Sequence, residues 1–132
     1  MGPSVLMAVK GSDVQLNCTH KKDSTFVQMY WYRQRPGQTM TLIVFTSSLS
    51  NKHDYGESDP NKFPVIKTVP ESGSLTVNNV ESDDSAVYFC SVSKHTVLLQ
   101  ILLILLLELA FKEPLHVIQP PCKYVYLWEF FK

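Results

Sequence analysis

The sequence predicts an all-β domain in which two sheets pack face to face. Cys18 and Cys90 stand far apart in the chain, and Trp31 lies between them in a strand-like segment. Tyr88 precedes Cys90 by two positions. Short strand-like runs, separated by turn residues, fill the chain between these positions. Two cysteines, a tryptophan and a tyrosine at these compatible spacings indicate a two-sheet sandwich with the tryptophan in its core.

The expected strands follow one another in short segments. They cover residues 5–9, 14–18, 29–33, 40–45, 63–69, 74–80 and 86–92. In the second, Val14, Leu16 and Cys18 alternate with polar residues, which is the period of a half-buried strand. Residues 35–38 read Arg-Pro-Gly-Gln and predict a turn, because proline fixes φ at the second position and glycine allows a positive φ at the third. Residues 46–60 form a polar loop that leaves room for a short edge strand.

Length and charge narrow the class of protein. The 132 residues suit one domain, which we place at residues 1–95, followed by an apolar tail at residues 96–132. The 12 basic and 12 acidic residues cancel, so the chain lacks the strongly basic character of nucleic-acid-binding domains. A disulfide would require an oxidising compartment. No secretory signal pattern precedes the domain, so we expect the amino-terminal end to be incomplete.

Several segments together resemble the variable domain of a T-cell receptor, most nearly that of a beta chain. They are residues 31–38 (WYRQRPGQ), 62–65 (KFPV), 74–77 (SLTV) and 84–90 (DSAVYFC), and the resemblance covers residues 3–93. It implies an immunoglobulin variable-type sandwich with an inter-sheet disulfide between Cys18 and Cys90. The core residues that it implies are Trp31, Leu75 and Tyr88.

The resemblance also implies a function, which is antigen recognition on the extracellular side of the plasma membrane. The domain would pair with a second variable domain, and the heterodimer would bind a peptide displayed by a histocompatibility molecule. If Trp31 and Cys90 point inward, the alternate residues of their sheet face outward. Aromatic residues without charges on such a face are typical of an interface. The expected pairing residues are Tyr32, Gln34, Met40, Leu42 and Phe89.

Antigen-facing loops are expected at one end of the sandwich, where domains of this architecture bind. They cover residues 21–28, 46–56 and 91–96. The candidate contact residues are Asp23, Ser24, Thr25, Phe26, Ser47, Ser48, Ser91, Val92 and Ser93. One alternative is that these loops are solvated connectors without a ligand. Another is that the outward apolar residues are scattered surface residues, which need no partner.

An ion pair, a modification pattern and an unpaired cysteine carry further expectations. Lys62 and Asp84 should form a partly exposed ion pair, as in related domains, at the end opposite the antigen loops. Asn17-Cys18-Thr19 fits the N-glycosylation pattern, and its use stays open. Cys122 either stays free or pairs between chains. The histidines are dispersed and no catalytic motif occurs, so neither an enzyme nor a metal or other cofactor is expected.

After residue 93 the chain departs from the family pattern. The Phe-Gly-x-Gly motif of a joining strand is missing, because no glycine follows Gly73. Residues 97–111 form an apolar run with three interpretations: a membrane span that is short for the hydrocarbon core, a buried strand that replaces the joining strand, or an aggregation-prone tail. If nothing replaces the joining strand, the strand that holds Cys90 keeps an unpaired edge.

A fourth hypothesis derives the tail from the gene. In the receptor family, a variable segment ends shortly after its second cysteine and is followed by a recombination signal with the heptamer CACAGTG. His95, Thr96 and Val97 can be encoded CAC-ACA-GTG, which contains that heptamer, although no nonamer echo follows. Translation through an unrearranged segment would then produce the tail.

The alternative function for the whole chain is a non-rearranging immunoglobulin-type adhesion or co-receptor module with a membrane tail.

Overall fold

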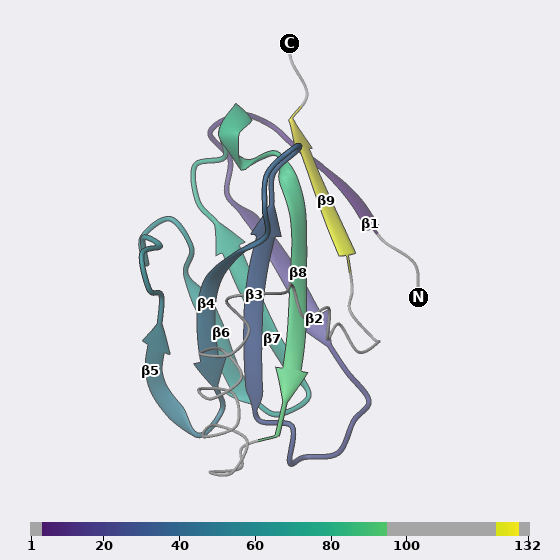
Figure 1. The fold of residues 1–132 in the computed structure, drawn as a ribbon, viewed down its shortest axis with the longest axis vertical. Coiled ribbons are helices and arrows are strands. Elements are labelled where there is room, and N and C mark those ends of the chain that lie inside the picture. The colour runs from purple at the N-terminus through teal and green to yellow at the C-terminus, as the bar shows by residue number, and fades with distance from the viewer. Residues whose placement is uncertain (1–3, 95–123, 130–132) are drawn as a thin grey trace.

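The computed structural model describes residues 4–94 and 124–129, which fold as two β-sheets packed face to face (Figure 1). Within these residues, the larger sheet has six strands in the order β1-β9-β8-β3-β4-β5, and the smaller has three in the order β2-β7-β6. The predicted two-sheet sandwich is therefore confirmed. The elements are β1 (Ser4–Ala8), β2 (Val14–Thr19), β3 (Gln28–Gln34), β4 (Thr41–Ser47), β5 (Ser50–Asp54), β6 (Val65–Val69), β7 (Ser72–Val77), the short 3-10 helix η1 (Ser82–Asp84), β8 (Ala86–Ser93) and β9 (Tyr124–Glu129).

Alternation and turn chemistry fix the strands where the sequence predicts them. Val14, Leu16 and Cys18 in β2 are buried and the residues between them are exposed, as their period requires. The turn at residues 35–38 is confirmed, because Gly37 has a φ of 69° and the Gln38 N–H donates to the Arg35 carbonyl over 3.0 Å. The polar loop at residues 46–60 contains the anticipated edge strand, β5, which pairs with β4.

The core is centred on the bond between the two sheets. The predicted Cys18–Cys90 disulfide joins β2 to β8, with a Cα–Cα distance of 6.4 Å across 72 positions of sequence. Trp31 lies directly opposite Cys90 in the β3–β8 register and is 1% exposed. Leu75 lies opposite Leu16 in the smaller sheet, and both are buried in the same cluster. A disulfide that closes a loop of this size adds about 4 kcal/mol in the chain-entropy model.

A buried tyrosine fixes the chain where it leaves η1. Tyr88 is completely buried, and its hydroxyl donates to the backbone carbonyl of Asp84 over 3.0 Å. This is the bond expected of a tyrosine two positions before the second cysteine. Burial raises the pKa of Tyr88 to about 12, and the nearby Asp84 carboxylate also raises it.

The Asp84 side chain connects three segments at this end of the sandwich. Its Oδ2 accepts from Lys62 Nζ over 2.6 Å and from the Glu81 N–H over 2.9 Å, and Arg33 Nη1 lies 3.7 Å from Oδ1. The expectation of a partly exposed pair is wrong for the acid, because Asp84 is 3% exposed. Removing one partner of a buried pair typically costs about 3–5 kcal/mol, whereas an exposed pair contributes about 1 kcal/mol or less.

The position beside β8 is occupied by β9, a strand from beyond residue 95, where the sequence predicts the domain to end (Figure 1). It pairs antiparallel with β8 from Ala86 to Phe89 and parallel with β1 from Ser4 to Ala8. An unpaired edge on the strand that holds Cys90 was expected only if nothing replaced the joining strand, and over residues 86–89 β9 occupies that edge. The apolar run at residues 97–111 lies outside the described residues, as does Cys122. In the part of the chain that the structure describes, no helix is long and apolar enough to cross a membrane.

We expect Tyr88→Phe to lower the free energy of unfolding by about 1–3 kcal/mol near neutral pH, because the Asp84 carbonyl loses a buried donor. Because the folded pKa of Tyr88 exceeds its ordinary value of 10.0, its contribution is complete below pH 10 and is lost as pH rises through 12. Urea unfolding of both proteins at pH 8 and pH 11 should show the difference shrinking by roughly 1 kcal/mol. A difference that stays constant would contradict this assignment.

We expect Tyr126→Pro to lower the melting temperature, because β9 has hydrogen-bonded neighbours on both sides and proline cannot donate to either. The loss of one ladder bond should cost about 1–3 kcal/mol. Lys132→Pro, outside the strand, is the control. Thermal melts followed by circular dichroism measure the change, and equal melting temperatures would show that β9 does not stabilise the sandwich.

Candidate functional site

The outer face of the larger sheet brings together four of the five predicted pairing residues. In the strand register, Tyr32 of β3 lies opposite Leu42 of β4 on one side and Phe89 of β8 on the other. Gln34 follows two positions along β3 and lies opposite Val87. Because residues two apart share a face of a strand, these side chains form one surface. We call it the outer sheet face.

A bulge in β4 adds an aromatic residue to this face. The register shifts between Trp31 and Tyr32, so that Trp31 lies opposite Val44 and Tyr32 opposite Leu42, which leaves Ile43 as the additional residue. Ile43 and Val44 are both buried at 1% exposure or less. Phe45 therefore returns to the outer sheet face, three positions after Leu42. Simple alternation could not place it there.

Aromatic contacts organise the loop-side half of the outer sheet face. The Tyr30 ring stacks on Tyr32 with a centroid distance of 6.4 Å and contacts Phe45 at 5.0 Å. The Ser93 hydroxyl lies 3.4 Å from the Tyr30 hydroxyl. The sequence analysis missed Tyr30 and Phe45. The signal for Tyr30 was present, because it alternates with Tyr32, whereas the position of Phe45 depends on the bulge.

The outer sheet face carries no charge on the described strands β3, β4 and β8. Its residues there are Tyr30, Tyr32, Gln34, Leu42, Phe45, Val87, Phe89 and Ser91. Leu42 is 47% exposed, and Met40, just before β4, is 39% exposed. The Gln34 side-chain amide donates to the Gln38 carbonyl over 3.2 Å, which leaves its carbonyl oxygen as an acceptor. Such a face can bury apolar area against a partner without desolvating a charge.

The backbone register of β9 places one more strand beside the row of β8. Tyr124 lies opposite Phe89, and Tyr126 lies opposite Val87. These two positions share the row of the outward residues of β8. The sequence analysis did not find them, because the segment lacks the Phe-Gly-x-Gly motif by which a joining strand is identified.

The first predicted loop, at residues 21–28, lies where β3 begins and β4 and β8 end, opposite η1 (Figure 1). Asp23 shapes it by accepting from the Thr25 N–H over 2.9 Å and also from the Thr25 hydroxyl. These two bonds hold the pKa of Asp23 below its ordinary value. Lys22 and Lys94 place their ammonium groups 4.8 and 5.2 Å from the Phe26 ring centroid. Exposed Ser24 completes this loop.

The second predicted loop is a tight hairpin between β4 and β5, which pair at Ser47 and Ser50. Ser48 ties it to the first loop, because its N–H donates to the Val27 carbonyl over 3.0 Å. Ser47 itself is buried, and its hydroxyl accepts from the Leu49 N–H over 3.2 Å. Leu49, which the sequence analysis did not single out, is 67% exposed at the tip.

The third predicted contact segment differs from its expectation. Ser91, Val92 and Ser93 belong to β8 rather than to a loop. Val92 packs against the core, and the Ser93 hydroxyl donates to Gln28 Oε1 over 2.9 Å. Lys94 is the first residue beyond the strand, and its Nζ lies 4.0 Å from Asp23 Oδ2. The first loop and the end of β8 therefore meet at one surface.

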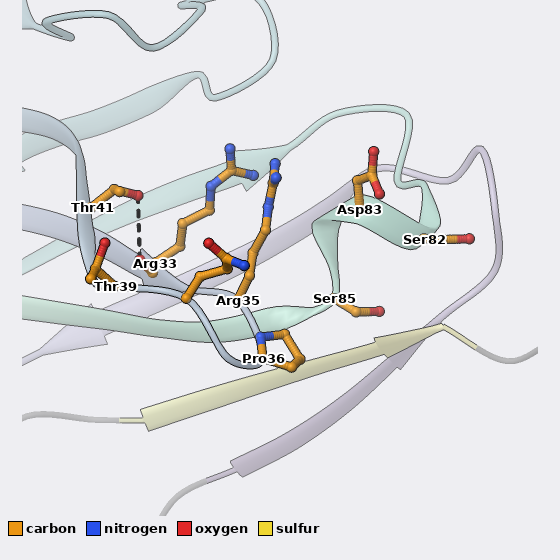
Figure 2. Close-up of a pocket in the computed structure, with 9 residues that line it drawn as sticks. Arg33, Arg35, Pro36, Thr39, Thr41, Ser82, Asp83 and Ser85 are labelled. Carbon is orange, nitrogen blue, oxygen red and sulfur yellow. Dashed lines mark hydrogen bonds between the residues drawn. The ribbon is translucent and has the colours of Figure 1, made fainter.

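A hollow of about 590 Å³ lies at the other end of the sandwich, near η1, where Figure 2 shows the Arg33 and Arg35 side chains lying side by side. Its lining offers serine and threonine hydroxyls but no histidine or cysteine that could activate them. Among residues 4–94 and 124–129, no cluster of histidine, cysteine or acidic residues could hold a metal ion. This hollow is remote from the loops, and it shows no catalytic arrangement.

Comparisons with known proteins agree with this geometry. The model of the immunoglobulin V-set domain family matches residues 1–100. The human protein "T cell receptor beta variable 29-1" is 34% identical over 90 residues, which cover 68% of this chain and 79% of that protein. Human "Immunoglobulin lambda variable 4-3" is 33% identical over 95 residues, which cover 72% of this chain and 75% of that protein.

A solved structure shows the same fold. It comes from work on "T cell specificity and activation by the bacterial superantigen toxic shock syndrome toxin-1", and its chain superposes with a TM-score of 0.69 at 22% identity. The match covers 96% of this chain and 94% of that one. V-set domains are extracellular or cell-surface binding modules, typically pair and are not enzymes, which confirms the expectation of a non-catalytic protein. The chain belongs to the immunoglobulin V-set family and, within it, resembles the variable segments of T cell receptor beta chains.

Proposed function

We propose that this chain is the antigen-recognition variable domain of a T-cell receptor chain. It pairs through its outer sheet face with a second variable domain, on the extracellular side of the plasma membrane. The loop end of the heterodimer then binds a peptide presented by a histocompatibility molecule. The resemblance to human T cell receptor beta variable segments supports this choice among the functions of V-set domains.

The observation that carries the proposal is the aromatic outer sheet face, which is uncharged over β3, β4 and β8. Leu42 and Met40 expose about 40–50% of their surface, and Tyr32, Phe45 and Phe89 are only half-buried. The outward residues of the smaller sheet are instead mostly short and polar (Gln15, Asn17, Thr19, Ser74 and Thr76). A partner seated on the larger sheet gains apolar burial, and the aromatic contacts around Tyr30 keep this surface ordered before binding.

The loop end supports the second half of the proposal. Phe26 and Leu49 supply apolar contact area, while Asp23 and Lys94 supply opposite charges. The bond from the Ser48 N–H to the Val27 carbonyl fixes two of the loops relative to each other. Peptide recognition by a rigid sandwich needs this combination of adjacent loops with mixed chemistry.

A non-rearranging adhesion or co-receptor module is the second candidate, and β9 is the observation that favours it. A sheet that is completed from within the chain needs no added joining segment. The genomic sequence across codons 94–97 separates the two candidates. A recombination signal there supports the receptor and the read-through origin of the tail, whereas one continuous exon supports the co-receptor module.

We expect Gln34→Glu to weaken pairing with a T-cell receptor alpha-type variable domain. The substitution would bury an unpaired carboxylate in the interface, which should cost about 2 kcal/mol or more, a roughly thirtyfold rise in Kd. Sedimentation of the mixed domains measures the association. Gln15→Glu is the matched control, because Gln15 is exposed on the smaller sheet. Equal association of both variants would identify a module that does not pair through this face.

A further inference from the structure

We propose that Asn17 accepts an N-linked glycan, whose first sugars cover the outward surface of the smaller sheet. Asn17-Cys18-Thr19 is the one place in the sequence that fits the acceptor pattern. In β2, Asn17 and Thr19 are exposed, whereas Cys18 between them is buried in the disulfide. The pleat of the strand therefore presents both residues of the pattern on the solvent side.

A row across the smaller sheet connects Asn17 to an exposed apolar side chain. The strand register places Asn17 opposite Ser74 of β7, and Ser74 opposite Ile66 of β6. All three share the outward face, and Ile66 is 58% exposed. Two strand spacings separate Asn17 from Ile66, which is about 10 Å. A glycan attached to Asn17 can therefore lie along the row and shield Ile66.

The surface along this row is hollowed and suits a sugar. A groove of about 300 Å³ is lined by Asn17, Thr19, Ile66, Thr68, Ser72, Gly73 and Ser74. The lining combines hydroxyl groups with one aliphatic side chain and carries no charge. Pyranose rings present hydroxyls at their edges and C–H groups on their faces, so they complement such a lining.

The position leaves the other proposed surfaces open. β2 belongs to the smaller sheet, whose outward surface faces away from the outer sheet face of the larger sheet (Figure 1). A glycan on Asn17 would not obstruct a partner seated on Tyr32 and Leu42. This inference shares with the proposed function only passage through the secretory pathway, which the disulfide also requires.

The chemistry sets the order of events. The Asn17 side-chain nitrogen forms a bond to C1 of the sugar in a lipid-linked pyrophosphoryl oligosaccharide. The bond from C1 to the pyrophosphate oxygen breaks, the lipid pyrophosphate leaves, and the amide gives up one proton. In the folded domain β2 is paired with β7 and Cys18 is bonded to Cys90, so transfer has to precede closure of the disulfide. Occupancy should therefore rise when closure is delayed.

The test is expression of the full chain behind a secretory leader in mammalian cells. We expect peptide N-glycosidase to shift the gel mobility of the secreted protein and mass spectrometry to find Asn17 converted to aspartic acid in the treated product. Asn17→Gln and Thr19→Ala should lose the shift, while Thr19→Ser, the matched control, should keep it. Mild reductant during synthesis should increase the modified fraction. A secreted, unshifted parent protein, or an unchanged fraction under reductant, would overturn the corresponding claim.

Shielding of Ile66 by the glycan can be measured separately from glycosylation itself. Hydroxyl-radical labelling of Ile66 should be lower in the glycosylated protein than in Asn17→Gln, while labelling of Leu49, at the loop end, should not change. Equal labelling of Ile66 in both proteins would show that the glycan projects away from the groove. Pairing of the Asn17→Gln variant with an alpha-type variable domain should be unchanged, so failure of the glycan proposal and failure of the pairing proposal are distinguishable.

Discussion

The contact of Trp31 with the Cys18–Cys90 disulfide is the constraint on which the rest of the structure depends. The bond fixes β2 of one sheet to β8 of the other, and Trp31 sits opposite Cys90 in the adjoining strand. With these residues inward, strand alternation determines which residues of β3 and β8 face outward. A register slip of one residue in β3 would send Trp31 into solvent and Tyr32 into the core. The same packing that stabilises the domain therefore positions its outer sheet face.

Two features turn this framework into a candidate binding surface: a bulge in β4, and the absence of charged residues from the outer face of β3, β4 and β8. The bulge at Ile43 buries two consecutive apolar residues and returns Phe45 to the outer sheet face beside Tyr30. The charged residues Lys62 and Asp84 lie instead at the η1 end, paired with each other. On β3, β4 and β8 the face proposed for pairing therefore carries no charge that a partner would have to bury, and the charged Asp54 lies on the edge strand β5, opposite Phe45. The loop end carries the ionic contact between Asp23 and Lys94.

Local patterns predict only some of this structure. The period of Val14, Leu16 and Cys18 defines β2, and the positions of Trp31 and Tyr88 define the fold and the core bond to Asp84. The bulge at Ile43 and the burial of Asp84 depend on packing between distant strands, which alternation does not encode. The position of β9 was also not predicted, because backbone pairing beside β8 and β1 requires an alternating segment of suitable length rather than a Phe-Gly-x-Gly motif.

The central claim is that the outer sheet face of the larger sheet, and not that of the smaller sheet, receives a second variable domain. Site-specific photo-crosslinking tests it most directly, with a photoreactive residue placed at Leu42 in one protein and at Ile66 in another. Both side chains are about half exposed, at 47% and 58%, on opposite faces of the sandwich. The account predicts that an alpha-type variable domain is captured from Leu42 and not from Ile66. Capture from Ile66 alone, or from neither position while the two domains co-sediment, would contradict it.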